Sequence, residues 1–294
     1  ITIPPEHRQL YSNFLATIGL TAIDGYFDYN YKTLKFILQL NGACLPTDLN
    51  PLIDDWWDDI WTDFSFGPDI PYGDFYSLGI LGKSKGKTTM NGFASFNRVN
   101  YRSLQAKNGS LHVTVLPHQT QISDMFIELE NGQIDGELIF TRSNINEHTF
   151  LSFDINGSIN PSDSKSVFGS STEKILSRFE TNSTVRIDAK GKIHINAQDS
   201  TDINSTSFCI SANSDSNISF SGIEFDNLSF DLNSTSESTT VSPLLFQIAD
   251  GNGSGSLLFS HDQNTTILNL DIVLVGANRR HFVERTKLSK SFID

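Results

Sequence analysis

The chain has 294 residues, of which 38% are hydrophobic and 19% are charged, and its formal net charge is -13. This acidic balance argues against nucleic acid as a partner, because affinity for a phosphate backbone depends on clustered Lys and Arg. The few charges, the 22 Phe residues and the abundance of Ser, Thr, Asn and Gly favour a β-rich extracytoplasmic protein over a helical cytosolic enzyme.

The first predicted element is an amphipathic helix over residues 4–18. Two prolines mark its start, and Leu10, Phe14 and Ile18 lie at helical spacing. We expect this helix to cap the open end of a sheet.

From Tyr26 the hydrophobic pattern changes to a period of two, which predicts β-structure. The strand expected there carries four alternating apolar residues: Leu34, Phe36, Leu38 and Leu40. The dipeptide Asn41-Gly42 is expected to turn the chain after it.

A second helix is predicted over residues 50–64. Asn50 can cap it, and Pro51 suits its first position. Its apolar face would include Trp56, Trp57 and Trp61.

An acidic cluster occupies the same segment, and we interpret it as the solvated face of the helix rather than a cation site: Asp54, Asp55, Asp58, Asp59 and Asp63. The tryptophans are likewise interpreted as core rather than as platforms for a sugar ring.

Short strands are predicted for the rest of the first half of the chain, over 111–115, 127–129 and 134–140. Asn-Gly turns at Asn108 and Asn131 would separate them. In the second half a strand is predicted over 150–156, and helix is expected over 170–180. Further alternating segments predict strands at 185–187, 193–195, 208–210, 218–220, 228–232, 244–248, 257–259 and 268–274.

The two halves repeat one another. The segment beginning Phe96-Asn-Arg-Val99 returns as Phe220-Ser-Gly-Ile223, and Asn131-Gly132 with the strand after it returns as Asp250-Gly251. A repeat that keeps the apolar positions indicates duplication of one structural unit. We therefore predict a mainly β fold of two consecutive antiparallel β-sheet units, resembling a groove or solenoid, with short capping helices. The expected divisions are a lead-in over 1–25, units over 26–142 and 143–261, and a third strand set with a basic tail over 262–294.

No motif indicates catalysis, a metal or a cofactor. Cys44 and Cys209 lie at non-equivalent positions of the two units, and no spacing of Cys and His suggests zinc. The glycine-rich segment 251–256 lacks the Lys and the following helix of a phosphate-binding loop, so we interpret it as a turn. A non-enzymatic protein is therefore expected.

These features together resemble a known family. Strands ending in Asn-Gly, a Pro-started segment after them, a Phe-containing strand leading to Gly79 or Gly191, and a closing strand with two glycines are similar to the AsmA-like and TamB-like envelope proteins. The resemblance covers most of residues 26–276. It implies a periplasmic protein, held to the inner membrane by a segment absent here, that shields lipid chains during transport between membranes or acts in outer-membrane assembly. Phospholipid or another acyl-chain lipid is the implied partner, together with membrane proteins of the envelope.

The predicted lipid-binding residues are those of the strand that recurs at the start of each unit. They are Leu34, Phe36, Leu38, Leu40, Leu151, Phe153, Ile155, Leu268, Leu270, Ile272 and Leu274. If stacked units align these strands, their apolar sides form a continuous strip. Two alternatives stay open from the sequence: a secreted or surface β-solenoid adhesin that binds carbohydrate, and a structural spacer without a ligand.

Overall fold

The mainly β prediction is confirmed by the structure, a computed structural model, in which a large antiparallel sheet and a small sheet account for nearly all regular structure described. The structure describes residues 9–18, 21–48, 64–80, 88–102, 104–142, 149–161, 163, 177–181, 183–195, 207–262 and 265–286.

The chain divides into two compact units. Unit 1 comprises Ile1–Glu130 and Gly136–Glu147, and unit 2 comprises Asn131–Asp135 and His148–Asp294. The strands of unit 1 are β1 (Gln9–Ile18), β2 (Thr21–Asn30), β3 (Lys35–Ala43), β4 (Phe64–Phe66), β5 (Tyr72–Ile80), β6 (Thr89–Tyr101), β7 (Leu104–Leu116) and β8 (Gln119–Leu129). Strand β9 (Gly132–Arg142) contributes residues to both units.

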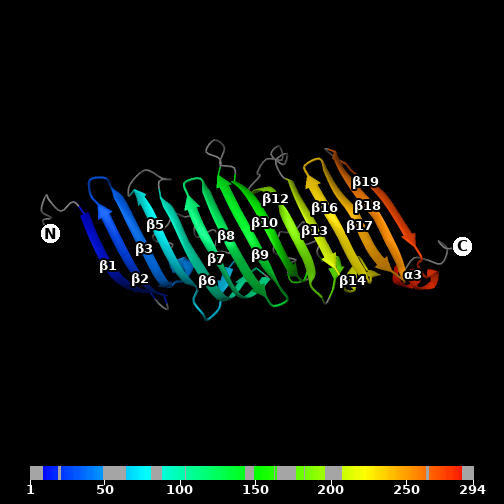
Figure 1. Cartoon of the computed structure of the whole chain (residues 1–294), viewed down its shortest axis with the longest axis horizontal. Coiled ribbons are helices and arrows are strands. Elements are labelled where there is room, and N and C mark those ends of the chain that lie inside the picture. The colour runs from blue at the N-terminus through cyan, green and yellow to red at the C-terminus, as the bar shows by residue number, and fades with distance from the viewer. Residues whose placement is uncertain are drawn as a thin grey trace. The chain divides into compact units, whose positions relative to one another are not determined.

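Unit 2 holds the remaining elements. They are β10 (Thr149–Ile159), β11 (Phe179–Glu180), β12 (Val185–Ile195), β13 (Ser207–Ser214), β14 (Ile218–Phe220), β15 (Ile223–Phe225), β16 (Asn227–Thr235), β17 (Ser238–Ile248), β18 (Gly251–Asp262), β19 (Thr265–Val275) and the helix α3 (Arg279–Thr286). The large sheet has 16 strands in the order β1-β2-β3-β5-β6-β7-β8-β9-β10-β12-β13-β16-β17-β18-β19, with β4 paired to β6, and the small sheet has the order β11-β14-β15 (Figure 1).

The predicted helix over residues 4–18 is wrong where the structure describes it. Residues 9–18 form β1, which pairs along its whole length with β2. The ring of Phe14 lies over Gly25 of β2, in the space that a side chain would fill there. This pairing with a distant segment outweighs the local helical spacing.

The other two predicted helices fall mainly outside the described residues. This holds for residues 50–63, including Trp56, Trp57 and Trp61, and for 164–176. Where the structure resumes, the prediction is wrong, because Phe64 begins β4 and Phe179 begins β11.

One predicted turn is confirmed and three are wrong. Asn131 lies in the turn between β8 and β9, but Asn41-Gly42 lies within β3 and Asn108-Gly109 within β7, where the register with β8 shifts on both sides. The glycine-rich segment 251–256 belongs to β18, and the turn before it is formed by Ala249 and Asp250.

Five phenylalanines cover a glycine directly opposite on the neighbouring strand. In each pair, ring atoms occupy the position that a Cβ of the glycine would take: Phe14 on Gly25, Phe36 on Gly79, Phe75 on Gly92, Phe96 on Gly109 and Phe246 on Gly253. Glycine alone weakens a strand, and an aromatic ring across it restores the packing.

The buried core of unit 2 gathers at one end of the strands. It contains Val185, Leu228, Phe246 and Ile248, against which Phe225 of the small sheet and Phe282 of α3 pack. In Figure 1, β14 and α3 lie at this same lower end of the unit 2 strands. The small sheet and the helix thus cover one end of the sheet face in unit 2.

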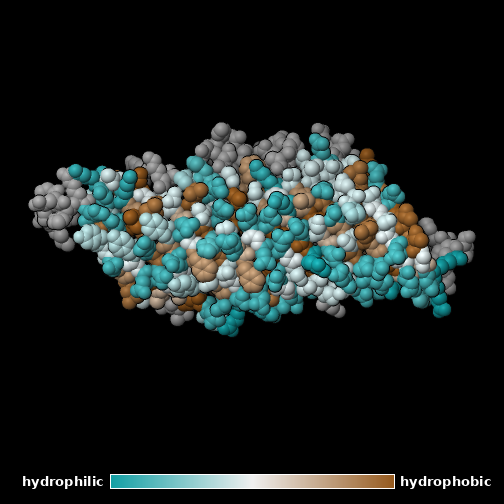
Figure 2. All heavy atoms as spheres, in the orientation of Figure 1, coloured by the Kyte–Doolittle hydropathy of each residue, from teal (hydrophilic) through white to brown (hydrophobic). Residues whose placement is uncertain are grey.

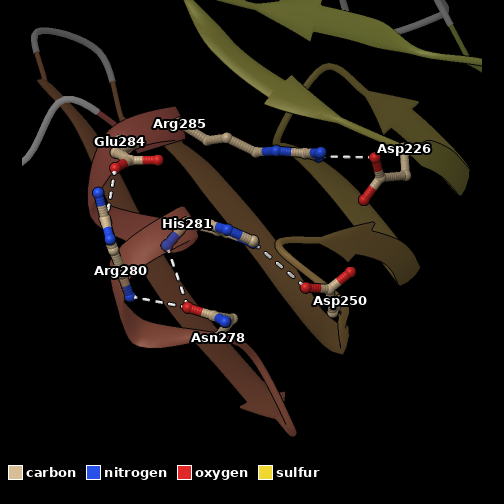
Figure 3. Close-up of polar contacts among 7 residues, drawn as sticks. All are labelled: Asp226, Asp250, Asn278, Arg280, His281, Glu284 and Arg285. Atoms are coloured by element: carbon tan, nitrogen blue, oxygen red, sulfur yellow. Dashed lines mark hydrogen bonds and ion pairs between the residues drawn. The ribbon is translucent and has the colours of Figure 1, made fainter.

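Helix α3 is fixed to this end by polar contacts (Figure 3). The Asn278 side chain caps the helix, accepting hydrogen bonds from the backbone N–H groups of Arg280 and His281 at 3.1 and 3.3 Å. Arg285 Nη1 lies 2.6 Å from Asp226 Oδ1, and His281 Nδ1 lies 3.3 Å from Asp250 Oδ2. The bond to Asp226 also raises the pKa of the Arg285 guanidinium above its ordinary value. Part of the predicted basic tail is therefore a docked helix.

We expect Arg285→Gln to lower the free energy of unfolding by about 1 kcal/mol, because the ion pair is only about one-third exposed on each side. Urea unfolding followed by circular dichroism measures this loss. The control is Arg280→Gln, whose partner Glu284 is on the same helix and whose side chain is largely exposed, so its loss should stay below about 0.5 kcal/mol. Equal losses would mean that Arg285 does not hold the helix in place.

Candidate functional site

The sheet of unit 2 has one apolar face and one polar face, and the strand register defines both. Seven consecutive strands place one apolar residue each in a single line across the sheet. This central apolar row consists of Ile155, Ala189, Ile210, Leu232, Val241, Leu257 and Leu270. Cross-strand neighbours on one face pack against one another, so the row is a continuous apolar surface.

The rows on either side of it continue the same face. The row on one side consists of Gly157, Ile187, Ala212, Phe230, Leu244, Gly255 and Ile272. The row on the other side consists of Phe153, Gly191, Phe208, Ser234, Thr239, Phe259 and Leu268, so it is apolar at both ends and polar in the middle. The opposite face is polar: Asp154 and Lys190, paired across β10 and β12, form an ion pair with Oδ2 and Nζ 2.5 Å apart.

The register brings together the predicted lipid-binding residues of unit 2. Phe153 and Ile155 on β10 lie in the same rows as Leu268 and Leu270 on β19, and Leu151 follows on the same side of β10 by alternation. Ile272 lies in the row next to the central one. Leu274, by contrast, packs against the buried core at the covered end, and the residues before it on this side of β19 are exposed.

Unit 1 has an apolar face of the same kind. Phe36, Leu38 and Leu40 are half-buried on β3, and Leu40 belongs to a row across seven strands with Phe14, Gly25, Phe75, Gly92, Val113 and Ile122. Leu34 does not belong to this strand. It ends the turn before β3, with a left-handed φ of 58° and an exposed side chain.

Sequence reasoning restricted the site to the repeated strands and so missed most of the central apolar row. Ala189, Ile210, Leu232, Val241 and Leu257 lie on strands between the predicted ones. The alternation of their segments was visible, but the register that aligns them depends on pairing between distant strands.

Most of the apolar face is only partly shielded from solvent. On β19 the residues of this face are exposed, with Leu268 52% and Leu270 58% accessible. Most other members of the central apolar row, such as Ile155, Ile210 and Leu257, are half-buried. A contiguous apolar face that is left partly accessible is typical of a binding surface.

The polar face of unit 1 contains a shallow depression. Tyr26, Gln39 and Tyr76 lie opposite one another on three adjacent strands there, and Asp24, Asn41 and Asp74 form the next row. Its further lining residues are Asn13, Phe14, Leu15, Gly25, Leu40 and Phe75.

Reactive groups are few among the described residues. They include no cluster of His, Cys, Asp or Glu placed to hold a metal ion. Cys44 and Cys209 are both free thiols. Burial, together with the nearby Asp48, raises the pKa of the Cys44 thiol to about 11, which keeps it protonated and unreactive near neutral pH.

In the part of the chain that the structure describes, no helix has the length and apolar character to cross a bilayer. Comparisons with family models, curated proteins and solved structures gave no match for this chain.

Proposed function

We propose that this protein binds the acyl chains of lipids on its apolar sheet faces and performs no catalysis. The observation that supports this most directly is the central apolar row, in which seven strands of unit 2 each contribute an apolar residue to one line. An acyl chain needs continuous apolar contact and no specific polar partner, and the row offers that contact.

The length and energetics of the row agree with this ligand. Seven strands about 4.8 Å apart span about 29 Å, which is longer than one acyl chain, since the chains of two leaflets together fill about 30 Å. Each methylene transferred from water gains about 0.8 kcal/mol, so a chain that covers only part of the row can be held.

The cellular setting is part of the same proposal and derives from the resemblance to AsmA-like and TamB-like proteins. We place the protein in the periplasm, where it would shield phospholipid chains in transport between membranes or in outer-membrane assembly. Its partners would be the lipid itself and membrane proteins of the envelope.

Photocrosslinking tests the site directly. A photoreactive residue at Phe36 or Phe153, both on the apolar faces, should capture co-purifying lipid, detected by mass spectrometry. The matched controls are Gln39 and Asn156, exposed residues on the opposite faces of the same two strands. A protein that carries no lipid, or equal capture from both faces, would contradict the proposal.

Two adjacent leucines on β18 allow a sharper comparison. Leu257 belongs to the central apolar row, whereas Leu258 is on the opposite face, between Thr240 and Asn269. We expect Leu257→Asp to lower lipid affinity about tenfold, because a carboxylate replaces apolar contact worth about 1.5 kcal/mol or more. Leu258→Asp should leave it unchanged. Affinity is measured by displacement of a fluorescent fatty acid, after circular dichroism shows that both variants are folded.

Glycan binding is the second candidate function, and the depression on the polar face of unit 1 favours it. Tyr26 and Tyr76 flank Gln39, with two strand spacings, about 10 Å, between the tyrosines. Aromatic rings beside amides and carboxylates suit the apolar faces and hydroxyls of a sugar. On a glycan array, Tyr76→Ala should weaken binding about fivefold, and Tyr11→Ala, an exposed tyrosine outside the depression, should not. Binding of neither lipid nor glycan would favour the structural spacer.

A further inference from the structure

Strand β19 differs from its neighbours because exposed apolar residues lie on both of its faces. Leu268, Leu270 and Ile272 continue the apolar face, but the opposite side carries Ile267, Val273 and Val275. Figure 2 shows hydrophobic residues gathered over this strand on a face that is otherwise mainly hydrophilic. These residues are well exposed: Ile267 is 57% and Val273 is 54% accessible.

The paired strand gives Ile267 and Val273 no apolar neighbour. On β18, Ser260 lies opposite Ile267, and Ser254 lies opposite Val273. Among the described residues, β18 is the only strand that pairs with β19. Within the described part of the chain, the other edge of β19 therefore has no pairing strand over its 11 residues, which include no proline and only one charge, Asp271. Such an edge is a template for pairing with another strand.

The order of residues along β19 is nearly symmetric about Leu270. Ile267 and Val273 are three residues away on either side, Leu268 and Ile272 two, and Asn269 and Asp271 one. An antiparallel pair of two such strands, centred on Leu270, places Ile267 opposite Val273, Leu268 opposite Ile272 and Asn269 opposite Asp271. Every apolar residue from Ile267 to Val273 then has an apolar partner, whereas Leu274 and Val275 face threonines. Each carboxylate meets an amide that can donate to it.

We propose that the occupant of this edge is β19 of a second copy of this chain, paired about a two-fold axis at Leu270. An axis perpendicular to the sheet makes the contact self-complementary and closed, and it keeps the apolar faces of both copies on the same side. Formation of the dimer requires no lipid, so the test of the dimer is independent of the proposed lipid binding.

Sedimentation of the whole chain in lipid-free buffer tests the dimer. The mass should be twice the chain mass of 32.7 kDa at micromolar concentration. Leu270→Lys, which sets two ammonium groups against each other at the axis, should give the monomer. The control Leu15→Lys changes an exposed leucine on the edge strand β1, 71% accessible against 58% for Leu270, and should leave the dimer intact. A monomeric parent chain, or equal dissociation of both variants, would overturn the proposal.

An exchange of amide and carboxylate tests the register without a large change of side chain. Asn269→Asp sets a second carboxylate opposite Asp271 twice per dimer, and the dissociation constant should rise about fivefold at low salt. Adding Asp271→Asn restores an amide opposite each carboxylate, so the double variant should dimerise like the parent. If Asn269→Asp has no effect, or if the second change gives no recovery, the strands are not paired in this register.

Discussion

Replacement of Phe246 by Ala is expected to lower the free energy of unfolding by about 4 kcal/mol. Phe246 is only 8% exposed, its ring covers Gly253, and it contacts Phe225 of the small sheet edge-on, with 5.5 Å between ring centroids. The substitution removes a core side chain, uncovers a glycine within a strand and separates the two sheets at the covered end of unit 2. Urea unfolding followed by circular dichroism measures the loss.

The neighbouring Leu245 provides the control for this prediction. It points to the opposite face of β17 and is 47% exposed, so Leu245→Ala should cost less than about 1 kcal/mol. Equal losses for the two variants would show that the end of the apolar face is not closed by the packing described here.

Gly132→Ala is expected to destabilise the protein by about 3 kcal/mol. Gly132 has a φ of 122°, and a Cβ there would overlap the carbonyl oxygen of Ser158 on the adjacent strand. The obstacle is backbone within a ladder of hydrogen bonds, so it cannot rotate away as a side chain could. The substitution must therefore move β9 and β10 apart.

Gly276→Ala separates the two causes of that loss. Gly276 also has a positive φ, 77°, but no atom lies within 4 Å of its added Cβ. Only the cost of a left-handed alanine remains, about 1 kcal/mol. Thermal melts of both variants give the comparison, and a Gly132→Ala variant as stable as Gly276→Ala would refute the close approach of β10.

The strands of this fold could be predicted from the sequence where alternation was clean. Residues 268–274 form β19 as expected, because a period of two is a local property that each strand carries by itself. The strand formed by the N-terminal segment could not be predicted in this way, because Leu10 and Phe14 fit a helical spacing. The strand is revealed only by the packing of Phe14 on Gly25, which is distant in the sequence.

The errors at Asn-Gly dipeptides have the same origin. Asn108-Gly109 has the composition of a hairpin turn, yet Gly109 lies inside β7 because the ring of Phe96 fills the space above it. The basic tail expected within residues 262–294 contains helix α3, for which Asn278 offers a local signal as a helix cap. Its docking partners, Asp226 and Asp250, are far away in sequence.

The candidate site shows the same limit. The apolar character of Ile155 and Leu270 was recognised in the sequence, but their membership of one row depends on five intervening strands, each with its own register. Two of these pairings contain a register shift, after Phe230 and after Val241. No local sequence pattern reveals where such a shift occurs or which residues face one another beyond it.

The phenylalanine rings that cover glycines in unit 1 also shape the surface of its apolar face. A glycine leaves a hollow between larger neighbours, and a ring lying across it, as Phe75 lies across Gly92, levels that hollow. Where a ring fills such a hollow, the surface has no recess that could fix the end of an acyl chain or a bend at a double bond. A chain bound there would meet only low barriers to sliding along the rows, so we expect tolerance of many chain lengths and lateral movement of the bound lipid, in contrast to a closed pocket that selects one.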